Sequence, residues 1–244
     1  MAVLWAALSF TKVHEHRALG LAGRGAILVI DLEHYVGEIP LKMDTLAYTN
    51  PLGQYYSVTK FKYYISNIQL EDGNGKFYSY PGSHLVDEED AKSQEIWLGH
   101  VRNGKFVSML FTIGVDSIHN CSGAQSGDLD PLKGMFWTWN SGYIFFKLEG
   151  KSPASHSPGS IFEFHVGGYR KPYNNLKGVE LKFADELEIV PGQMKIVRVK
   201  ADIAQVFRFP NDIDLSVHSS ITEPSQAGII ANNYTDMFSI ITTH

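Results

Sequence analysis

The sequence has few of the features that mark disulfide-stabilised, nucleic-acid-binding or membrane-spanning proteins. Its 244 residues include one cysteine, Cys121, so no internal disulfide can form. The formal net charge is −5, and Lys and Arg do not cluster, which argues against a nucleic-acid partner. No apolar run approaches the roughly 18 residues that a membrane span requires. We therefore expect a globular protein that is soluble or at most tethered.

The N-terminal segment has an apolar stretch, Val3 to Phe10, but no basic residue precedes it and no small-residue cleavage site follows it. This pattern is atypical of a secretory signal peptide. We expect residues 1–25 to be a leader or a poorly structured segment. Residues 26–244 are expected to form one domain, because all-β domains often reach this length.

The remaining sequence predicts an all-β protein. Twenty-two glycines and ten prolines separate short runs rich in Val, Ile, Phe and Tyr, and no long segment keeps a 3.6-residue apolar period. The number and spacing of the runs favour an antiparallel β-sandwich with long functional loops. The predicted strands are Ala26 to His34, Tyr56 to Leu70, Lys105 to Ile113, Gly142 to Glu149, Ser160 to Gly167, Val179 to Phe183, Met194 to Ala201, Asp212 to Val217 and Met237 to Thr242.

Two local patterns refine this prediction. Glu71 to Lys76 carries turn residues between two β-rich runs, which indicates a hairpin. Ala201 to Val206 can form a short helical turn, with Asp202 near its start.

One predicted connection, residues 114–141, is too long for an ordinary sandwich turn. Long connections without regular structure are usually functional or disordered. This one contains Met135, Phe136, Trp137 and Trp139, and such side chains gain from burial. We therefore expect an ordered functional loop.

Two of the ten histidines are candidate metal ligands, because each stands near the end of a predicted strand. His34 shares the parity of the apolar residues Ile30 and Leu32, and a core histidine bonded to a backbone carbonyl is the simpler interpretation. His165 shares the parity of Glu163, its simpler partner, and precedes two glycines that let a backbone or ligand approach. Strand ends meet at the rims of a sandwich. The two imidazoles could thus form a small pocket with the aromatic loop, and such a site favours copper.

Other side chains of the loop allow different interpretations. Asp116, Asp128 and Asp130 could bind calcium through oxygen, or they could cap turns. Cys121 beside His119 lacks a recognisable hydrolase motif. A metal-free module that binds carbohydrate or protein is also possible, with an exposed platform made of Trp137, Trp139, Tyr143 and Tyr169.

Eight segments, in order along residues 26 to 242, carry a resemblance to a known family. They are Leu32 to Gly37, Phe61 to Ile68, Gly114 to Ser117, Ser122 to Gln125, Leu129 to Pro131, Gly134 to Tyr143, Phe164 to Tyr169 and Asn232 to Phe238. Together they are similar to the MbnP-like family of periplasmic copper-binding proteins, first associated with methanobactin systems. The tryptophan-rich segment is the most specific of the eight.

The resemblance implies a periplasmic β-sandwich that binds copper in copper uptake or homeostasis and is not an enzyme. It also implies that a di-haem peroxidase-like partner of the MbnH type oxidises a tryptophan to kynurenine, whose amine helps to bind copper beside histidines. Carried onto this chain, the modified residue would be Trp137 or Trp139, and the ligands would be His34 and His165. An indole nitrogen only donates, whereas an aryl amine has a lone pair for a metal. The metal-free binding module is the alternative.

Overall fold

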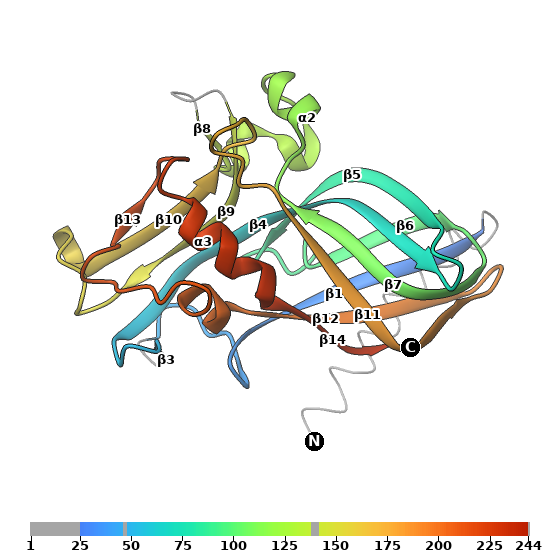
Figure 1. Ribbon diagram of the computed structural model, residues 1–244, viewed down its shortest axis with the longest axis horizontal. Coiled ribbons are helices and arrows are strands. Elements are labelled where there is room, and N and C mark those ends of the chain that lie inside the picture. Colours follow the sequence, from blue (N-terminus) through green and yellow to red (C-terminus); the bar gives the residue numbers. More distant parts are fainter. Residues whose placement is uncertain (1–24, 46–47, 138–141, 244) are drawn as a thin grey trace.

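The computed structural model describes residues 25–45, 48–137 and 142–243, and these form two β-sheets (Figure 1). In this part of the chain the first sheet has five strands, which are β1 (Ala26–Val36), β2 (Ile39–Pro40), β6 (Glu95–Val101), β12 (Met194–Asp202) and β14 (Phe238–Thr243). The second has nine strands, which are β3 (Tyr48–Thr49), β4 (Tyr55–Asp72), β5 (Phe77–Asp87), β7 (Gly104–Ile113), β8 (Phe136–Trp137), β9 (Gly142–Lys151), β10 (Ile161–Gly167), β11 (Lys177–Ile189) and β13 (Ser220–Ile221).

The first sheet runs in the order β14-β12-β1-β2, with β6 also beside β1, and the second runs β11-β7-β4-β9-β10-β13. Most pairs are antiparallel, but β1 pairs with β12 and β10 with β13 in parallel. A parallel pair needs a long crossover, and most of the second sheet lies between β1 and β12 in the sequence. The all-β sandwich prediction is confirmed, with mixed rather than purely antiparallel sheets.

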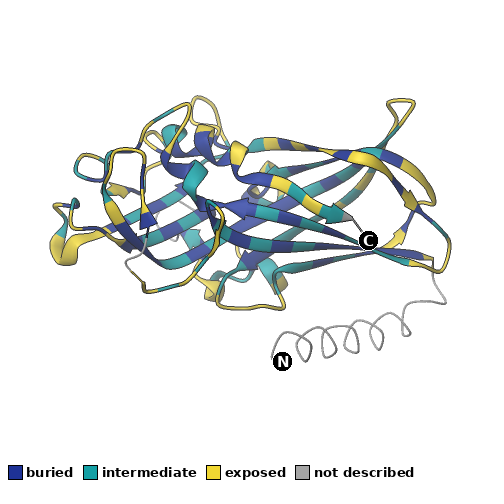
Figure 2. Ribbon diagram, turned by 90° about the horizontal axis from the view of Figure 1, so that it is seen from below, coloured by how far each residue is buried: buried dark blue, intermediate teal, exposed yellow. Residues whose placement is uncertain are grey.

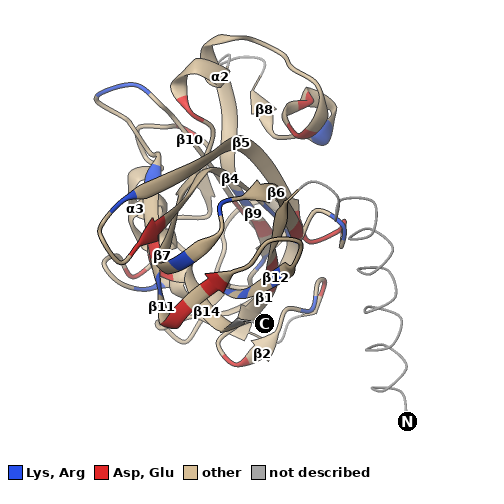
Figure 3. Cartoon of the chain, turned by 90° about the vertical axis from the view of Figure 1, so that its right-hand side faces the viewer, with Lys and Arg blue, Asp and Glu red and all other residues tan. Residues whose placement is uncertain are grey.

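Alternating side chains build the core between the sheets. On β11, Val179, Leu181 and Phe183 are buried, while the residues between them are exposed. This two-residue period places one face of a strand inside and the other in solvent. Buried and exposed residues alternate along the strands in the same way in Figure 2. Charged residues of both signs are interspersed over the end of the molecule that Figure 3 shows.

Helical segments are short. They are α2 (Ser117–Cys121), η2 (Gly127–Leu129), η3 (Pro131–Lys133), η4 (Pro158–Ser160), η5 (Ile203–Phe207), α3 (Gly228–Asn233) and η6 (Tyr234–Met237). The predicted turn after Ala201 is confirmed as η5, where the carboxylate of Asp202 accepts the Ala204 N–H at 3.0 Å. Within the described ranges, no helix has the length and hydropathy needed to cross a bilayer.

One predicted strand is wrong. Asp212 to Val217 contains a turn in which the side chain of Asp214 accepts the Ser216 N–H, and its carbonyl accepts the His218 N–H at 2.7 Å. Local hydrogen bonds of this kind compete with strand pairing.

The hairpin at Glu71 to Lys76 is confirmed, because it joins β4 to β5. The sequence prediction missed β5 and β6. In β5, Pro81 and Gly82 interrupt the β-rich pattern, and Gly82 has a φ of +147°.

Candidate metal site at the tryptophan-rich loop

The predicted functional loop is ordered over residues 114–137. It packs on the outer face of the second sheet, where Met135 and Trp137 join Tyr64 and Phe145 in a hydrophobic cluster separate from the main core. Residues 138–141, including Trp139, lie outside the described residues, as do 1–24 of the predicted leader. The expectation of an ordered loop is therefore confirmed up to Trp137.

Buried polar groups hold the loop in place. The Oδ1 of Asn120, a residue that is 2% exposed, accepts the N–H of Tyr143 at 2.9 Å. The hydroxyls of Tyr64 and Tyr143 donate to the carbonyls of Asp128 and Leu129 at 2.8 and 2.7 Å. Burial raises the pKa of Tyr64 well above its ordinary value, so this hydroxyl remains a donor.

Trp137 is 6% exposed and packs directly against the backbone of Gly167. A Cβ at Gly167 would overlap the indole ring and lie 2.7 Å from the carbonyl oxygen of Tyr143. The predicted close approach of a backbone at the glycines after His165 is thus confirmed by the Tyr143 carbonyl, and the side chain of Trp137 also lies against Gly167. Tyr143 is fully buried, so Trp137 and Tyr143 do not form the exposed platform that the metal-free alternative needs.

His165 lies on the outer face of β10, in register with Lys147 on β9. Its Nε2 is 2.8 Å from Oε1 of Glu149, whereas its predicted partner, Glu163, accepts the hydroxyl of Ser220. The hydrogen bond from His165 lowers the pKa of Glu149. An ionised carboxylate only accepts, so in a neutral His165 ring the proton is on Nε2 and the lone pair is on Nδ1. Among the described residues, Nδ1 has no hydrogen-bond partner.

His165 and Trp137 line the same cavity, which has a volume of about 520 Å³. Phe136 and Ile144 add apolar walls, and Glu223 adds a carboxylate. The structure therefore brings together one predicted ligand and one predicted tryptophan.

His34 has a different environment. It is 6% exposed, as its parity with the apolar face predicts. Its Nδ1 is 2.5 Å from Oε2 of Glu88, and its Nε2 is 3.0 Å from the hydroxyl of Tyr63. The ring edge also packs on Phe61, with centroids 4.8 Å apart. Both ring nitrogens are engaged. His34 is thus a core histidine, but its partners are the side chains of Glu88 and Tyr63 and not the expected backbone carbonyl.

The two histidines lie on opposite faces of the second sheet. Tyr63, which contacts His34, is fully buried. It lies opposite Phe146 on β9, and Phe146 lies opposite Val166 on β10, so all three side chains face the core. His165 is the residue before Val166 along β10, and successive side chains on a strand point to opposite faces. The structure does not bring His34 and His165 together.

Two of the three loop aspartates cap helical turns, and the third forms an ion pair. Asp116 caps α2 by accepting the His119 N–H at 2.9 Å, and Asp130 caps η3. Asp128 forms an ion pair with Lys133 at 2.8 Å. Across the described part of the chain, no three His, Cys, Asp or Glu residues are arranged to hold a metal. Asp116 and Asp130 thus match the turn-capping interpretation, whereas Asp128 pairs with a lysine.

Sequence reasoning missed Glu149 as the partner of His165. Glu149 is a cross-strand diagonal neighbour, because β9 places it opposite Glu163, two residues from His165. Side chains at such diagonal positions can reach each other. This neighbour relationship can be recognised only when the register between β9 and β10 is known.

Comparison with known proteins finds a matching family and a solved structure with a similar fold. The model of the MbnP family matches residues 26–225. The fold is similar to that of MbnP from Methylosinus trichosporium, with a TM-score of 0.58 and 16% identity, covering 89% of this chain and 98% of that one. None of the curated proteins compared with the chain matches it.

Proposed function

Because this chain belongs to the MbnP family, we propose that it binds copper in the cavity that His165 and Trp137 share. The observation that carries this proposal is the pairing of His165 with Glu149. Metal-bound histidines usually donate their second ring N–H to a carboxylate, which fixes the tautomer and strengthens the ligand. His165 has this arrangement with Glu149, and an imidazole ligand suits copper.

The remaining donors come from the same cavity. Trp137 offers no lone pair while its indole is intact, but oxidation to kynurenine would add an aryl amine beside His165. A di-haem peroxidase-like partner of the MbnH type would perform this oxidation, as the family resemblance implies. Trp139 is the second candidate for modification. The carboxylate of Glu223 is available as an oxygen donor.

His34 belongs to the core in this proposal and not to the copper site. For His34 to bind a metal, either Glu88 or Tyr63 would have to give up its hydrogen bond. The biological role that follows is copper uptake or homeostasis in the periplasm, without catalysis.

Competition of the purified protein against a chromophoric Cu(I) chelator tests the site. We expect one copper per chain and at least a tenfold loss of affinity in His165→Ala. Glu149→Gln should lose about 10-fold to 100-fold, because the carboxylate orients the ligand. The exposed His156→Ala is the matched control and should bind like the wild type. Failure to bind copper, or unchanged affinity in His165→Ala, would overturn the proposal.

Peptide mass spectrometry of protein from its native cells tests the modification. We expect kynurenine in place of Trp137 or Trp139 in the peptide that spans the loop. Protein from cells that lack the oxidising partner should carry tryptophan at both positions. Tryptophan at both positions in the native protein would contradict the modification, while the His165 titration would still stand.

A further inference from the structure

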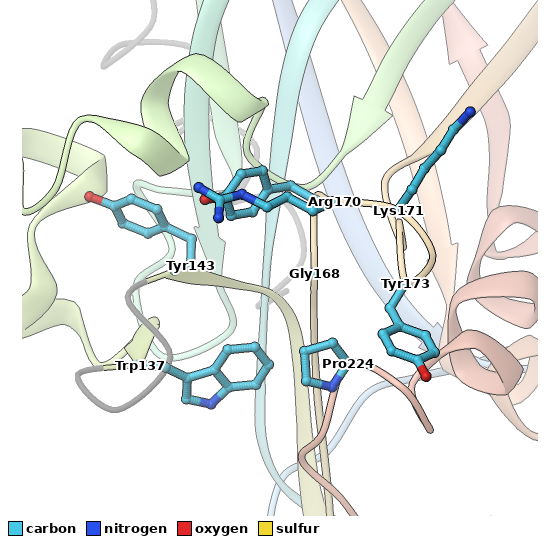
Figure 4. A pocket seen from close by; sticks show the side chains of 9 residues that line it. Trp137, Tyr143, Gly168, Arg170, Lys171, Tyr173 and Pro224 are labelled. Atoms are coloured by element: carbon cyan, nitrogen blue, oxygen red, sulfur yellow. The ribbon is translucent and has the colours of Figure 1, made fainter.

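A second cavity lies beside the first, with Trp137 as the wall that they share. Its volume is about 220 Å³, and its other lining residues differ from those of the His165 cavity. Figure 4 shows Trp137 and Pro224 on one side and Arg170 on the other. Pockets for drug-sized ligands typically measure about 300–1,000 Å³. This cavity therefore suits a smaller molecule of one or two fused rings.

The lining is aromatic and carries positive charge. Besides Trp137 it includes Tyr143, Tyr169 and Tyr173. Arg170 and Lys171 also line it, and none of its described lining residues is an Asp or Glu, although the whole chain has a net charge of −5. Aromatic rings prefer to stack against other flat groups. A lining that is both aromatic and positively charged favours a flat, negatively charged ligand.

Arg170 provides the charge. Its guanidinium lies over the ring of Tyr169, 4.8 Å from the centroid, and 3.7 Å from the sulfur of Cys121. It extends toward Tyr143, whereas Lys171 extends away from Trp137 (Figure 4). Among the described residues, no carboxylate lies within 4.0 Å of its nitrogens. A guanidinium offers five donors in a planar fork that matches a carboxylate, so most of these donors are open to a ligand.

The walls of the cavity are held in place without a ligand. Gly168 has a φ of +106°, and a Cβ there would lie 2.5 Å from the carbonyl oxygen of Tyr173 and 2.9 Å from Pro224. The side-chain amide of Asn175 donates to the carbonyls of Gly167 and Pro224 at 2.7 and 3.0 Å. These bonds join the end of β10 to two separate loops. A preformed site loses less entropy when a ligand binds.

We propose that this cavity binds a small, flat aromatic molecule carrying a carboxylate, with the carboxylate on Arg170 and the ring beside Trp137, Tyr169 and Tyr173. The site is separate from the copper site, since Trp137 is the one described lining residue that the two cavities have in common. Its occupant would nevertheless touch Trp137, so the two sites share one side chain.

Calorimetric titration of copper-free protein with 2-naphthoate and with its neutral analogue 2-naphthamide tests the proposal. We expect naphthoate to bind at least tenfold more tightly than naphthamide, because a charge-assisted bidentate contact is about twice as strong as a neutral one. Arg170→Gln should abolish this preference. Arg170→Lys should retain part of it, because lysine keeps the charge but lacks the fork.

Arg102→Gln is the matched control, because Arg102 also lies over a tyrosine ring, 4.9 Å from the centroid of Tyr78, but lines a different cavity. It should bind both compounds like the wild type. Equal affinity for the two compounds, an unchanged preference in Arg170→Gln, or no binding at millimolar naphthoate would each overturn the proposal. None of these measurements requires copper, so a negative result here would not contradict the proposed copper site.

Discussion

The indole ring of Trp137 lies against Gly167 so closely that the backbone leaves no room for a side chain. The first prediction follows from this contact. Gly167→Ala should lower the free energy of unfolding by about 1–3 kcal/mol, the usual cost of overpacking. Because the indole must shift, the near-ultraviolet circular dichroism of the folded protein should also change.

Gly178→Ala on β11 is the control for this substitution, since nothing lies within 4 Å of a Cβ at that position. It should leave the spectrum unchanged and be neutral or slightly stabilising. Equal effects of the two substitutions on urea unfolding would mean that Trp137 does not depend on Gly167 for its position.

Asn120 supports a second prediction, because it ties the functional loop to β9. Its amide donates to the carbonyl of Asp116 at 3.0 Å and its Oδ1 accepts the N–H of Tyr143. Asn120→Ala leaves that buried N–H without a partner, which costs about 1–3 kcal/mol. Urea unfolding measures this loss. Asn103→Ala, in an exposed turn, should change little. A neutral Asn120→Ala would show that water replaces the side chain.

The third prediction concerns the core histidine. His34→Ala removes a partner from both Glu88 and Tyr63 and leaves a cavity. We expect it to destabilise the protein by about 2–4 kcal/mol, through lost packing and unsatisfied polar groups. Tyr63→Phe removes one hydroxyl and should cost less. Copper affinity of the folded His34→Ala protein should equal that of the wild type. If His34→Ala lost as much copper affinity as His165→Ala, His34 would be a copper ligand.

The alternation of residues along each strand could be predicted from the sequence, and so could the sides to which the two histidines point. His34 lies with the apolar face, and His165 lies on the other face of its strand. Their separation could not be predicted, because parity within one strand does not say which sheet the strand joins. Strand β1 belongs to the first sheet and β10 to the second. The second cavity was missed for a related reason, since its walls come from segments far apart in the chain.

Cys121 leads to a fourth prediction, on pH dependence. The hydroxyl of Tyr169, 3.6 Å from its sulfur, and then the guanidinium of Arg170 lower the pKa of the thiol. A lowered pKa means that the reactive thiolate forms at a lower pH than in an ordinary cysteine. The rate of iodoacetamide alkylation should therefore reach half of its maximum at a lower pH in the folded protein than in the urea-unfolded chain.

Tyr169→Phe and Arg170→Gln should each move this midpoint upward, and Arg102→Gln should not move it. Identical midpoints for the folded and unfolded wild type would show that neither Tyr169 nor Arg170 stabilises the thiolate.

The fifth prediction tests the Glu149–His165 pair by its effect on stability in acid. The hydrogen bond from His165, followed by nearby positive charges, lowers the pKa of Glu149 in the folded state below its ordinary value of 4.5. A carboxyl group with a lowered pKa stabilises the fold fully above its unfolded value, and this contribution disappears as the pH falls through the folded value. Glu149→Gln keeps an acceptor but loses the charge.

The wild type should therefore be more stable than Glu149→Gln near neutral pH, and the difference should shrink as the pH falls below 4.5. Urea unfolding of both proteins at a series of pH values measures this difference, and other acidic groups cancel because both proteins share them. Glu180→Gln, at an exposed position of β11, serves as the control and should show a difference that stays nearly constant. A constant difference for Glu149→Gln as well would mean that the carboxylate does not hold His165 through its charge. The tautomer that leaves Nδ1 open for copper would then lack its support.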